Sequence, residues 1–483
     1  MTTSLPVFKP LTSASVKKID QTGRQILARI GIRIKGGTFL KRLEEAGAQV
    51  DYGNQRVRFD GERLDMLLSR APSHFTLYSR DGKNDLPLGN RKVHFANGGR
   101  VFRILDMATG GYRLTMLRDV AHTAMLVNHL EHIHFYVIAC QAHDLEPKYY
   151  HLNDFFYAFN HTTKHVMGGC DNLEGVEQVW KLASFITGGE ENLREKPFFS
   201  VITNPISPLT IEINTLNILD FCATHGIPVT CSPAPIAGAT SPATLAGTLA
   251  QMHAEALAGV AISQALAPGA KVLYGAVPTT MDLRNMEFTM GSVEIGMMGA
   301  SAVQLAKLYN LPIRAATGVT EAKRPDIQAG VEKSLSNFMV ATAGADCILL
   351  AAGMLDSGNS ISYEQYVIDN EILGMIHRTL SGITVNKDTL GFETIEQVGP
   401  GGHYIMQEHT VEHMMDEFFY PNISVRCNFD VWEERGRPDM LSRANDVVQS
   451  IIGEGEEEKE GLLDLDLLMG IRRNFPGIRK YLK

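Results

Sequence analysis

The sequence predicts an α/β protein: a TIM (β/α)8 barrel with an N-terminal α+β accessory region and a C-terminal helical tail. From about residue 134 onward, short β-rich apolar runs alternate with longer segments of helical pattern. The runs begin roughly 30 to 45 residues apart, which is the spacing of strand-plus-crossover units. Several runs are apolar throughout, as expected for strands that are buried on both faces of a parallel sheet.

The predicted strands follow one another through the middle of the chain. They are residues 134–140, 165–170, 198–204, 227–233, 271–277, 312–318, 346–352 and 383–388. Many end in Gly, Pro, Asn or Cys before a polar loop. An open, doubly wound sheet is the alternative, but it requires a G-x-G-x-x-G turn after the first strand, and no such turn is evident. The barrel is therefore the preferred fold.

Three regions are predicted from the change of pattern along the chain. They are the accessory region at residues 1–120, the barrel at 121–425 and the helical extension at 426–483. In the first region, helical patterns cover residues 14–32 and 38–48. Alternating apolar and polar residues at 55–60 and 91–96 then suggest hairpins.

Composition excludes several classes of function. Lys and Arg total 45 against 54 Asp and Glu, so the net charge is -9 and a broad electrostatic footprint for nucleic acid is missing. The N-terminus lacks the pattern of a secretory signal, and no apolar run approaches the roughly 18 residues of a membrane span. A cytoplasmic location is expected. The six cysteines show no C-x-x-C spacing and are expected to be thiols.

Candidate substrate-binding residues follow from the barrel, because the loops after its strands converge at one end. They are Phe102, Tyr112, Asn204, Tyr274, Asp282, Phe288, Glu321, Met354, Asp356, Asn359, His403 and Tyr404. Structural roles are open for several of them: Tyr274 equally fits the filling of the barrel, and Asp282 and Glu321 equally fit loop ion pairs. No residue is predicted to act as a covalent or acid–base catalyst.

The stretch 399-GPGGHY-404 raises a separate question. Barrels often bind phosphate in the loops after their last strands, and glycine-rich turns suit that role. However, no Lys or Arg falls between Gly344 and His377 or between Lys387 and Arg426. The surrounding acidic and aromatic residues favour a cation.

A zinc site is a further possibility, because His409 and His413 lie four residues apart on a predicted helix. Candidates for a third ligand are His403, Glu408, Cys140, Cys170 and Cys231. The spacing is not an H-E-x-x-H motif, and no metal is assigned.

Five stretches carry a resemblance to a known family. They are 164-KHVMGG-169, 203-TNPISPL-209, 317-TGVTEAKRPDIQAGVEKSLS-336, 353-GMLDSGNSISYEQYVIDNEILGMIHR-378 and 398-VGPGGHYIMQEHT-410. In this order, and over nearly the whole chain, the sequence resembles the trimethylamine methyltransferase family. The resemblance implies a TIM-barrel enzyme that moves a methyl group from a methylated amine to the cobalt of a separate corrinoid protein.

The founding members of that family carry pyrrolysine, and this sequence has none. It is therefore similar to the non-pyrrolysine branch, whose substrates are quaternary amines such as glycine betaine, proline betaine and carnitine. The resemblance implies a corrinoid that is carried by the partner, with no tightly bound cofactor on this chain. It also implies that the partner docks at the barrel mouth, and a homo-oligomer is expected.

A quaternary ammonium has no N–H group, so aromatic faces and negative charge must hold it. The aromatic candidates are Phe102, Tyr112, Tyr274, Phe288 and Tyr404, and the acidic candidates are Asp282, Glu321 and Asp356. Asn204, His403 and Arg103 are candidates for a substrate carboxylate. Two other functions stay open: zinc-assisted methyl transfer from a thiol or alcohol, and a non-catalytic barrel that binds quaternary amines.

Overall fold

A computed structural model describes residues 8–90, 92–107, 109–453 and 461–481. Eight parallel strands form one sheet and run in the hydrogen-bonded order β6-β19-β18-β15-β13-β11-β10-β9. A parallel bridge between Ala96 and Phe135 brings the two edges of the sheet together. The sheet is thus a near-closed (β/α)8 barrel, and the predicted fold class is confirmed.

Each barrel strand is short and buried. The strands are β6 (His94–Asn97), β9 (Tyr136–Val137), β10 (Val166–Gly169), β11 (Phe199–Thr203), β13 (Val229–Cys231), β15 (Val272–Ala276), β18 (Ile313–Ala316) and β19 (Cys347–Ala352). Seven of them lie within predicted strands.

The eighth barrel strand was predicted at the wrong end of the chain. Residues 383–388 form no strand, and the position is filled by β6, which pairs with β19 through Cys347 and His94. Residues 94–96 of the segment that suggested a hairpin therefore belong to a barrel strand. Since the last barrel helix, α12, ends at Leu380, the barrel begins earlier and ends earlier than the expected range of 121–425.

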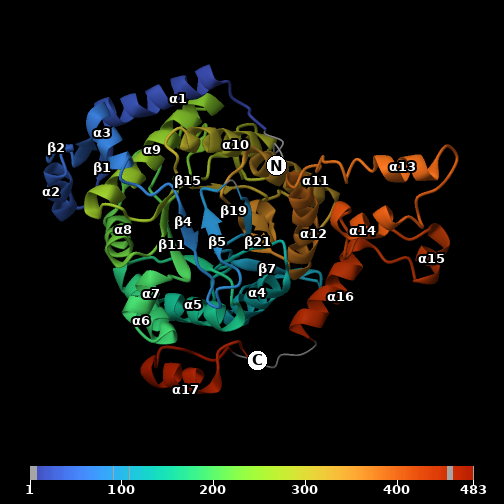
Figure 1. Cartoon of the computed structure of the whole chain (residues 1–483). Helices are drawn as coiled ribbons and strands as arrows, with labels where there is room; N and C mark the ends of the chain where they lie inside the picture. Colours follow the sequence, from blue (N-terminus) through green and yellow to red (C-terminus); the bar gives the residue numbers. More distant parts are fainter. Residues whose placement is uncertain (1–7, 91, 108, 454–460, 482–483) are drawn as a thin grey trace.

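Helices surround the sheet on its outer side (Figure 1). They are α4 (Leu117–His129), α5 (Tyr150–His161), α6 (Leu173–Thr187), α7 (Glu190–Glu195), α8 (Ile213–His225), α9 (Leu245–Leu266), α10 (Val293–Lys307), α11 (Ile327–Ala343) and α12 (Tyr363–Leu380). Small residues let them approach the strands closely. A Cβ added at Gly259 of α9 would lie 2.5 Å from Cys231 Sγ on β13. Among the described residues, no helix has both the length and the apolar character that crossing a membrane would require.

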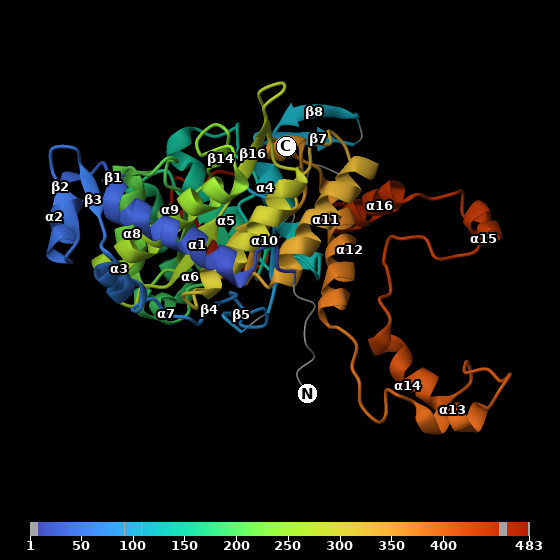
Figure 2. The same cartoon turned by 90° about the horizontal axis from the view of Figure 1, so that it is seen from above.

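The two ends of the barrel differ. The hairpin β4 (Phe75–Leu77) and β5 (Leu86–Leu88) closes one end by packing Leu77, Leu86 and Leu88 against the side chains inside the barrel. At the other end stand the hairpins β7 (Arg103–Asp106)–β8 (Gly111–Leu114) and β16 (Thr279–Asp282)–β17 (Glu287–Thr289). Figure 2 shows these two ends on opposite sides of the molecule. The second end is the one at which the parallel strands finish, so it is the barrel mouth.

Short elements complete the loops at the mouth. They are η2 (Pro147–Tyr149), β14 (Ile236–Ala237), β20 (Met354–Leu355), η3 (Asp356–Gly358) and β21 (Ser360–Ile361). Strand β21 pairs with β7 in parallel, so the loop after β19 is joined to the β7–β8 hairpin.

The N-terminal region packs on one side of the barrel. It contains α1 (Ser13–Gln25), η1 (Ile26–Ile30), β1 (Ile32–Ile34), α2 (Gly37–Glu45), β2 (Gln49–Asp51), β3 (Arg56–Arg58) and α3 (Gly61–Leu68). Strand β1 pairs in parallel with β12 (Thr210–Ile211), which belongs to a barrel loop. The α+β character that the sequence suggested for this region is confirmed.

After α12 the chain leaves the barrel as a C-terminal arm, which we define as residues 381–435. It contains α13 (Phe392–Val398), α14 (Glu408–Glu417) and α15 (Phe429–Glu434). The chain then returns as α16 (Met440–Ile452), which packs on α4 and α12, and as α17 (Leu465–Asn474). The helices α13 and α14 project away from the barrel and lie far from the mouth (Figure 2).

Candidate functional site

A cavity of about 620 Å³ lies at the barrel mouth. Its walls come from the ends of β9, β10 and β11, from the loop after β6, from α5 and α8, and from side chains on β18 and β19. The volume is in the usual range of small-molecule sites, about 300–1,000 Å³. This cavity is therefore the candidate binding site.

Arg314 is one of two arginines that line this cavity, the other being Arg100. Arg314 lies on β18, its side chain lines the cavity, and the residue is 5% exposed. No described residue accepts a hydrogen bond from its Nε or Nη1. Burial lowers the pKa of the guanidinium to about 10, so the group is still charged at neutral pH. A buried cation that lacks partners is costly, and an anionic group of a ligand would relieve that cost.

Asp154 is the acidic counterpart. It lies on α5, lines the same cavity and is 3% exposed. Its Oδ1 has no hydrogen-bond partner among the described residues. Burial raises the pKa of this carboxyl group to about 8, and Arg100 lowers it by a smaller amount. A cationic ligand beside Asp154 would favour the ionised carboxylate.

An ion pair orders the rim near Asp154. Arg100 donates from Nη1 and Nη2 to the two carboxylate oxygens of Asp171, at 2.9 and 3.0 Å. His151 Nε2 lies 3.2 Å from Asp171 Oδ2. The interaction with His151, followed by that with Arg100, holds the pKa of Asp171 below its usual range. Asp171 is therefore already paired and leaves Asp154 as the acid that faces the cavity unpaired.

Of the predicted site residues, the structure brings Phe102 and Asn204 to this cavity. Phe102 is 50% exposed, and its ring stands edge-on to that of His143, with centroids 6.0 Å apart. In the amide orientation that satisfies both groups, Asn204 Nδ2 donates to the carbonyls of Thr203 and Ser232 at 3.1 and 3.0 Å. This orientation leaves Asn204 Oδ1 as an acceptor.

A second set of predicted residues gathers in the loops after β18 and β19, outside the cavity wall. Glu321 Oε1 accepts hydrogen bonds from the amides of Met290 and Gly291, at 2.6 and 2.8 Å. Asp356 pairs with Lys323, and Asn359 Nδ2 donates to the carbonyl of Asp356 at 2.7 Å. These groups are engaged in holding loops together.

Met354, on β20, and Tyr112, on β8, are also engaged in contacts between these loops. Met354 is buried, and a Cβ added at Gly98 would meet its side chain at 2.0 Å. The Tyr112 hydroxyl donates to the carbonyl of Lys323. The hairpin is thereby fixed over the loop that follows β18.

A buried ion pair lies beneath these loops. Lys333 Nζ on α11 is 3.1 Å from Asp369 Oδ2 on α12 and also donates to the carbonyls of Gly318 and Met354. Asp369 accepts from the Gly353 amide at 2.7 Å. These contacts give Asp369 a structural role.

Three predicted residues lie apart from the cavity but within the barrel domain. Asp282 pairs with Arg284 at 2.7 Å on the β16–β17 hairpin, where Phe288 is 37% exposed. Tyr274 is fully buried, and its hydroxyl lies 2.8 Å from His253 Nδ1 on α9. Tyr274 therefore fills the layer between the sheet and the helices.

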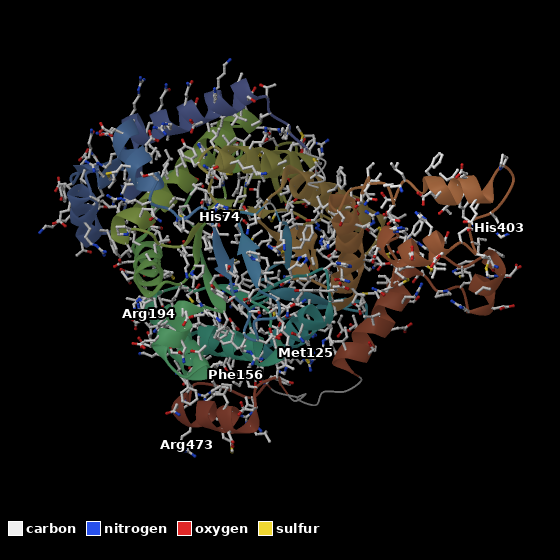
Figure 3. All side chains as sticks on the ribbon, viewed as in Figure 1. His74, Met125, Phe156, Arg194, His403 and Arg473 are labelled. Carbon is white, nitrogen blue, oxygen red and sulfur yellow. The ribbon has the colours of Figure 1, made fainter. Side chains whose placement is uncertain are left out.

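His403 and Tyr404 lie in the C-terminal arm, between α13 and α14. Figure 3 labels His403 at the outer edge of the molecule. The GPGGHY stretch is consequently not a loop of the barrel mouth, because the strand expected before it does not exist. An aromatic cage of the five predicted rings is not formed, and Phe102 alone among them lines the described cavity.

Arg314 and Asp154 were not among the candidate site residues predicted from the sequence, although each is a charged residue in a segment that is buried. Arg314 interrupts the apolar strand segment 312–318 with a charge that would be buried. Asp154 stands in helix α5, all of whose residues are buried except Tyr150. A charged residue inside a predicted buried strand or helix is therefore as good a candidate for a binding site as a charged residue in a loop.

Comparison with known proteins identifies a family. The family described as Trimethylamine methyltransferase (MTTB) matches residues 1–467. A trimethylamine methyltransferase of Desulfitobacterium hafniense is 35% identical over 428 residues, which cover 89% of this chain and 86% of that protein. The glycine betaine methyltransferase of strain Y51 of the same species is 31% identical over 449 residues, or 93% of each chain.

The fold has a counterpart among solved structures. The crystal structure of the Methanosarcina barkeri monomethylamine methyltransferase superposes with a TM-score of 0.50 at 11% identity, and the match covers 92% of this chain and 93% of that one. At this level of identity the likeness concerns the fold alone.

Proposed function

Because the chain belongs to the trimethylamine methyltransferase family, we propose that it transfers a methyl group from a betaine-type quaternary amine to the corrinoid of a partner protein. Glycine betaine, proline betaine and carnitine are members of this substrate class. Each carries a quaternary ammonium and a carboxylate. The observation that supports this proposal is the presence in one cavity of a buried base, Arg314, and a buried acid, Asp154, each with side-chain atoms that have no hydrogen-bond partner among the described residues.

A zwitterion satisfies both groups at once. Its carboxylate would accept charge-assisted hydrogen bonds from Arg314, and its ammonium would lie near the Asp154 carboxylate. Phe102 adds one aromatic face at the rim, worth about 0.5–2 kcal/mol as a cation–π contact. An amine without a carboxylate would leave the guanidinium unpaired. The cavity therefore favours a betaine over a simple methylamine.

The chemistry of a quaternary ammonium suits a cavity without an acid–base catalyst. When the methyl group leaves, the electron pair of the C–N bond stays on nitrogen, and the product is a neutral tertiary amine. No proton is needed for this step. The chain must bind and orient the substrate, and alignment of the reacting atoms supplies several kcal/mol in favourable cases.

The methyl acceptor belongs to the partner protein, whose reduced cobalt supplies the nucleophile. The cavity lies at the mouth, at the end of the barrel that the β4–β5 hairpin leaves open. The hairpins β7–β8 and β16–β17 stand at this end and would form part of the docking surface (Figure 2). No separate cofactor on this chain is required by this arrangement.

A homo-oligomer is also proposed, through the C-terminal arm. The arm exposes large apolar side chains, among them Phe392, Ile405 and Met406, the last of which is 81% exposed. Packing against a second copy would bury them. Sedimentation of wild type and Met406→Glu compares the assembly: a smaller species in the variant supports the proposal, and equal masses refute it.

The function is tested by following conversion of Co(I) to methyl-Co(III) on a cognate corrinoid protein across a panel of amines. Glycine betaine, proline betaine and carnitine are expected to donate a methyl group, and choline, which lacks the carboxylate, is expected to be poor. Calorimetry on the same panel separates binding from transfer. Tight betaine binding without transfer to any corrinoid protein would indicate a non-catalytic binding barrel.

Zinc-assisted methyl transfer finds less support. It requires a metal next to the reacting substrate. Across the described residues, the group with metal-ligand geometry is Asp388, His409 and His413, and it lies in the arm rather than at the cavity.

A further inference from the structure

We propose that Asp388, His409 and His413 bind a zinc ion that fastens the C-terminal arm. One ligand atom from each residue lies within 4.8 Å of the others. The two histidines are on α14, and Asp388 is in the turn before α13. The site is separate from the cavity at the barrel mouth and has no part in the proposed methyl transfer.

The distances between the ligand atoms approach those around a tetrahedrally coordinated zinc ion. With metal–ligand distances of about 2.0–2.2 Å, two ligand atoms of a tetrahedron lie about 3.3–3.6 Å apart. His413 Nε2 is 3.3 Å from Asp388 Oδ2, so this edge already has the required length. The two imidazole rings lie with centroids 4.3 Å apart, because residues four apart share one face of a helix. Small side-chain rotations would bring His409 to the same distance.

One of the two histidine nitrogens makes no hydrogen bond, and the other would exchange one contact for a metal. His413 Nε2 is buried and makes no hydrogen bond within the described chain. His409 Nε2 lies 3.1 Å from the carbonyl oxygen of Asp388, where only a proton on that nitrogen makes the contact favourable. A metal ion would replace this proton and satisfy both nitrogens and the carboxylate together.

The backbone around Asp388 is held in place for this contact. The Asn386 amide donates to Thr389 Oγ1 at 3.0 Å, and the Thr389 amide donates to Asn386 Oδ1 at 2.9 Å. Gly391, with φ of +59°, lies against His409, and a Cβ at this glycine would come within 3.3 Å of His409 Nε2. The turn thus presents Asp388 toward α14 and leaves room for the ring.

The helices of the arm have little apolar packing between them that could hold them together. The helices α13, α14 and α15 bury no residue, so apolar packing does not hold them to one another. Small units without a core are commonly stabilised by a structural metal. Zinc would join the turn at Asp388 to a helix that begins 20 residues later at Glu408.

The donor set selects the metal. Two imidazoles and one carboxylate suit zinc, whereas calcium and magnesium prefer oxygen ligands throughout. Three protein ligands leave the fourth position for water.

Binding is tested on the full chain after treatment with a chelator, by titration with Zn²⁺ and by metal analysis after dialysis. Wild type is expected to retain about one zinc per chain, and the His409→Ala/His413→Ala variant is expected to retain none. His403→Ala is the matched control, because it removes an exposed histidine of the same arm outside the cluster. Equal zinc content in wild type and the double variant would overturn the proposal, as would no zinc in wild type.

Proteolysis provides a second measurement that does not depend on activity. Lys387 is highly exposed and immediately precedes Asp388, so trypsin cleavage after Lys387 reports on the turn. Zinc is expected to slow this cleavage at least about tenfold in wild type and in His403→Ala, and to leave the double variant unchanged. If zinc leaves the cleavage rate unchanged in all three proteins, the ion does not fasten the arm.

Discussion

The barrel and the C-terminal arm are stabilised in different ways, although they are parts of one chain. In α9 of the barrel nearly every residue is buried, between the sheet on one side and α1 on the other. In α13, α14 and α15 no residue is buried. Burial of apolar surface therefore holds the barrel, whereas the arm relies on a few polar fixed points.

Those fixed points lie where the arm meets the barrel. Glu371 on α12 accepts hydrogen bonds from the amides of Asn422 and Ser424, both at 3.0 Å. Ile423, between them, is 1% exposed. Arg378 donates to the carbonyl of Glu417 from Nε and Nη2. The comparison between the two regions can be tested by matched substitutions.

The largest difference is expected for a pair of phenylalanines. Phe159 is fully buried among Phe155, Phe198 and Phe199, and Phe159→Ala is expected to lower the free energy of unfolding by about 3–5 kcal/mol. Phe392 in the arm is 68% exposed within one chain, and at protein concentrations that keep the chains apart Phe392→Ala is expected to change it by less than about 0.5 kcal/mol. Urea unfolding compares the two variants under those conditions. A large loss for Phe392→Ala in the separated chain would contradict the comparison.

A similar contrast is expected for ion pairs. Asp369→Asn would leave Lys333 charged and buried without a counter-ion, and a loss of about 3 kcal/mol in unfolding free energy is expected. The double variant Lys333→Met/Asp369→Leu should recover part of that loss. The control is Glu393→Gln in the arm, which breaks the exposed pair with Lys387 and should have no measurable effect. Equal effects in both regions would contradict the comparison.

The cavity is tested by Arg314→Met. The variant removes the cation that is proposed to bind the carboxylate, so glycine betaine is expected to bind about 30- to 100-fold more weakly. Binding of choline should change little, since choline has no carboxylate. Arg284→Ala, on an exposed arginine of the β16–β17 hairpin, is the control. Calorimetry measures all three proteins, and an equal loss for both ligands would indicate a damaged fold instead of a lost contact.

Most of the barrel could be predicted because the sequence pattern of a strand is contained within the strand itself. Seven strands are runs of apolar residues followed by a break, and that pattern is local. The eighth could not be predicted, because β6 (His94–Asn97) continues a stretch of alternating polar and apolar residues and becomes a barrel strand only by pairing with β19. The segment 383–388 has suitable β-branched residues, but it leaves the barrel and finds no strand to pair with.

The site was less predictable for a related reason. Asn204 could be placed at the mouth because it ends a predicted strand, and Phe102 was expected in a segment over the mouth; the structure puts both in the cavity lining. Arg314 and Asp154 lie inside a strand and a helix, where the sequence pattern shows burial but not which cavity a side chain enters. His403 and Tyr404 were assigned to the mouth only through the strand that is not formed. Side-chain direction depends on tertiary structure, which local patterns do not contain.

The pH dependence of binding is expected to be more modest than the effect of Arg314→Met. In the free protein the pKa of Asp154 is raised to about 8, so its carboxyl group is mostly neutral at pH 7 and mostly ionised at pH 9. A ligand cation favours the ionised form, and betaine affinity should therefore rise about tenfold from pH 7 to pH 9. Asp154→Asn should abolish this rise. Calorimetry at several pH values measures it, and a flat profile for wild type would remove Asp154 from the site.

The smallest effect is expected for the betaine affinity of a variant that lacks the zinc ligands of the arm. If the arm and the barrel are stabilised independently, His409→Ala/His413→Ala should lose zinc yet bind glycine betaine within about twofold of wild type, since distant sites are usually additive. Arg314→Met should in turn keep its zinc. Metal analysis and calorimetry on the same preparations check both. A strong loss of betaine affinity in the arm variant would mean that the arm of one copy reaches the barrel mouth of another.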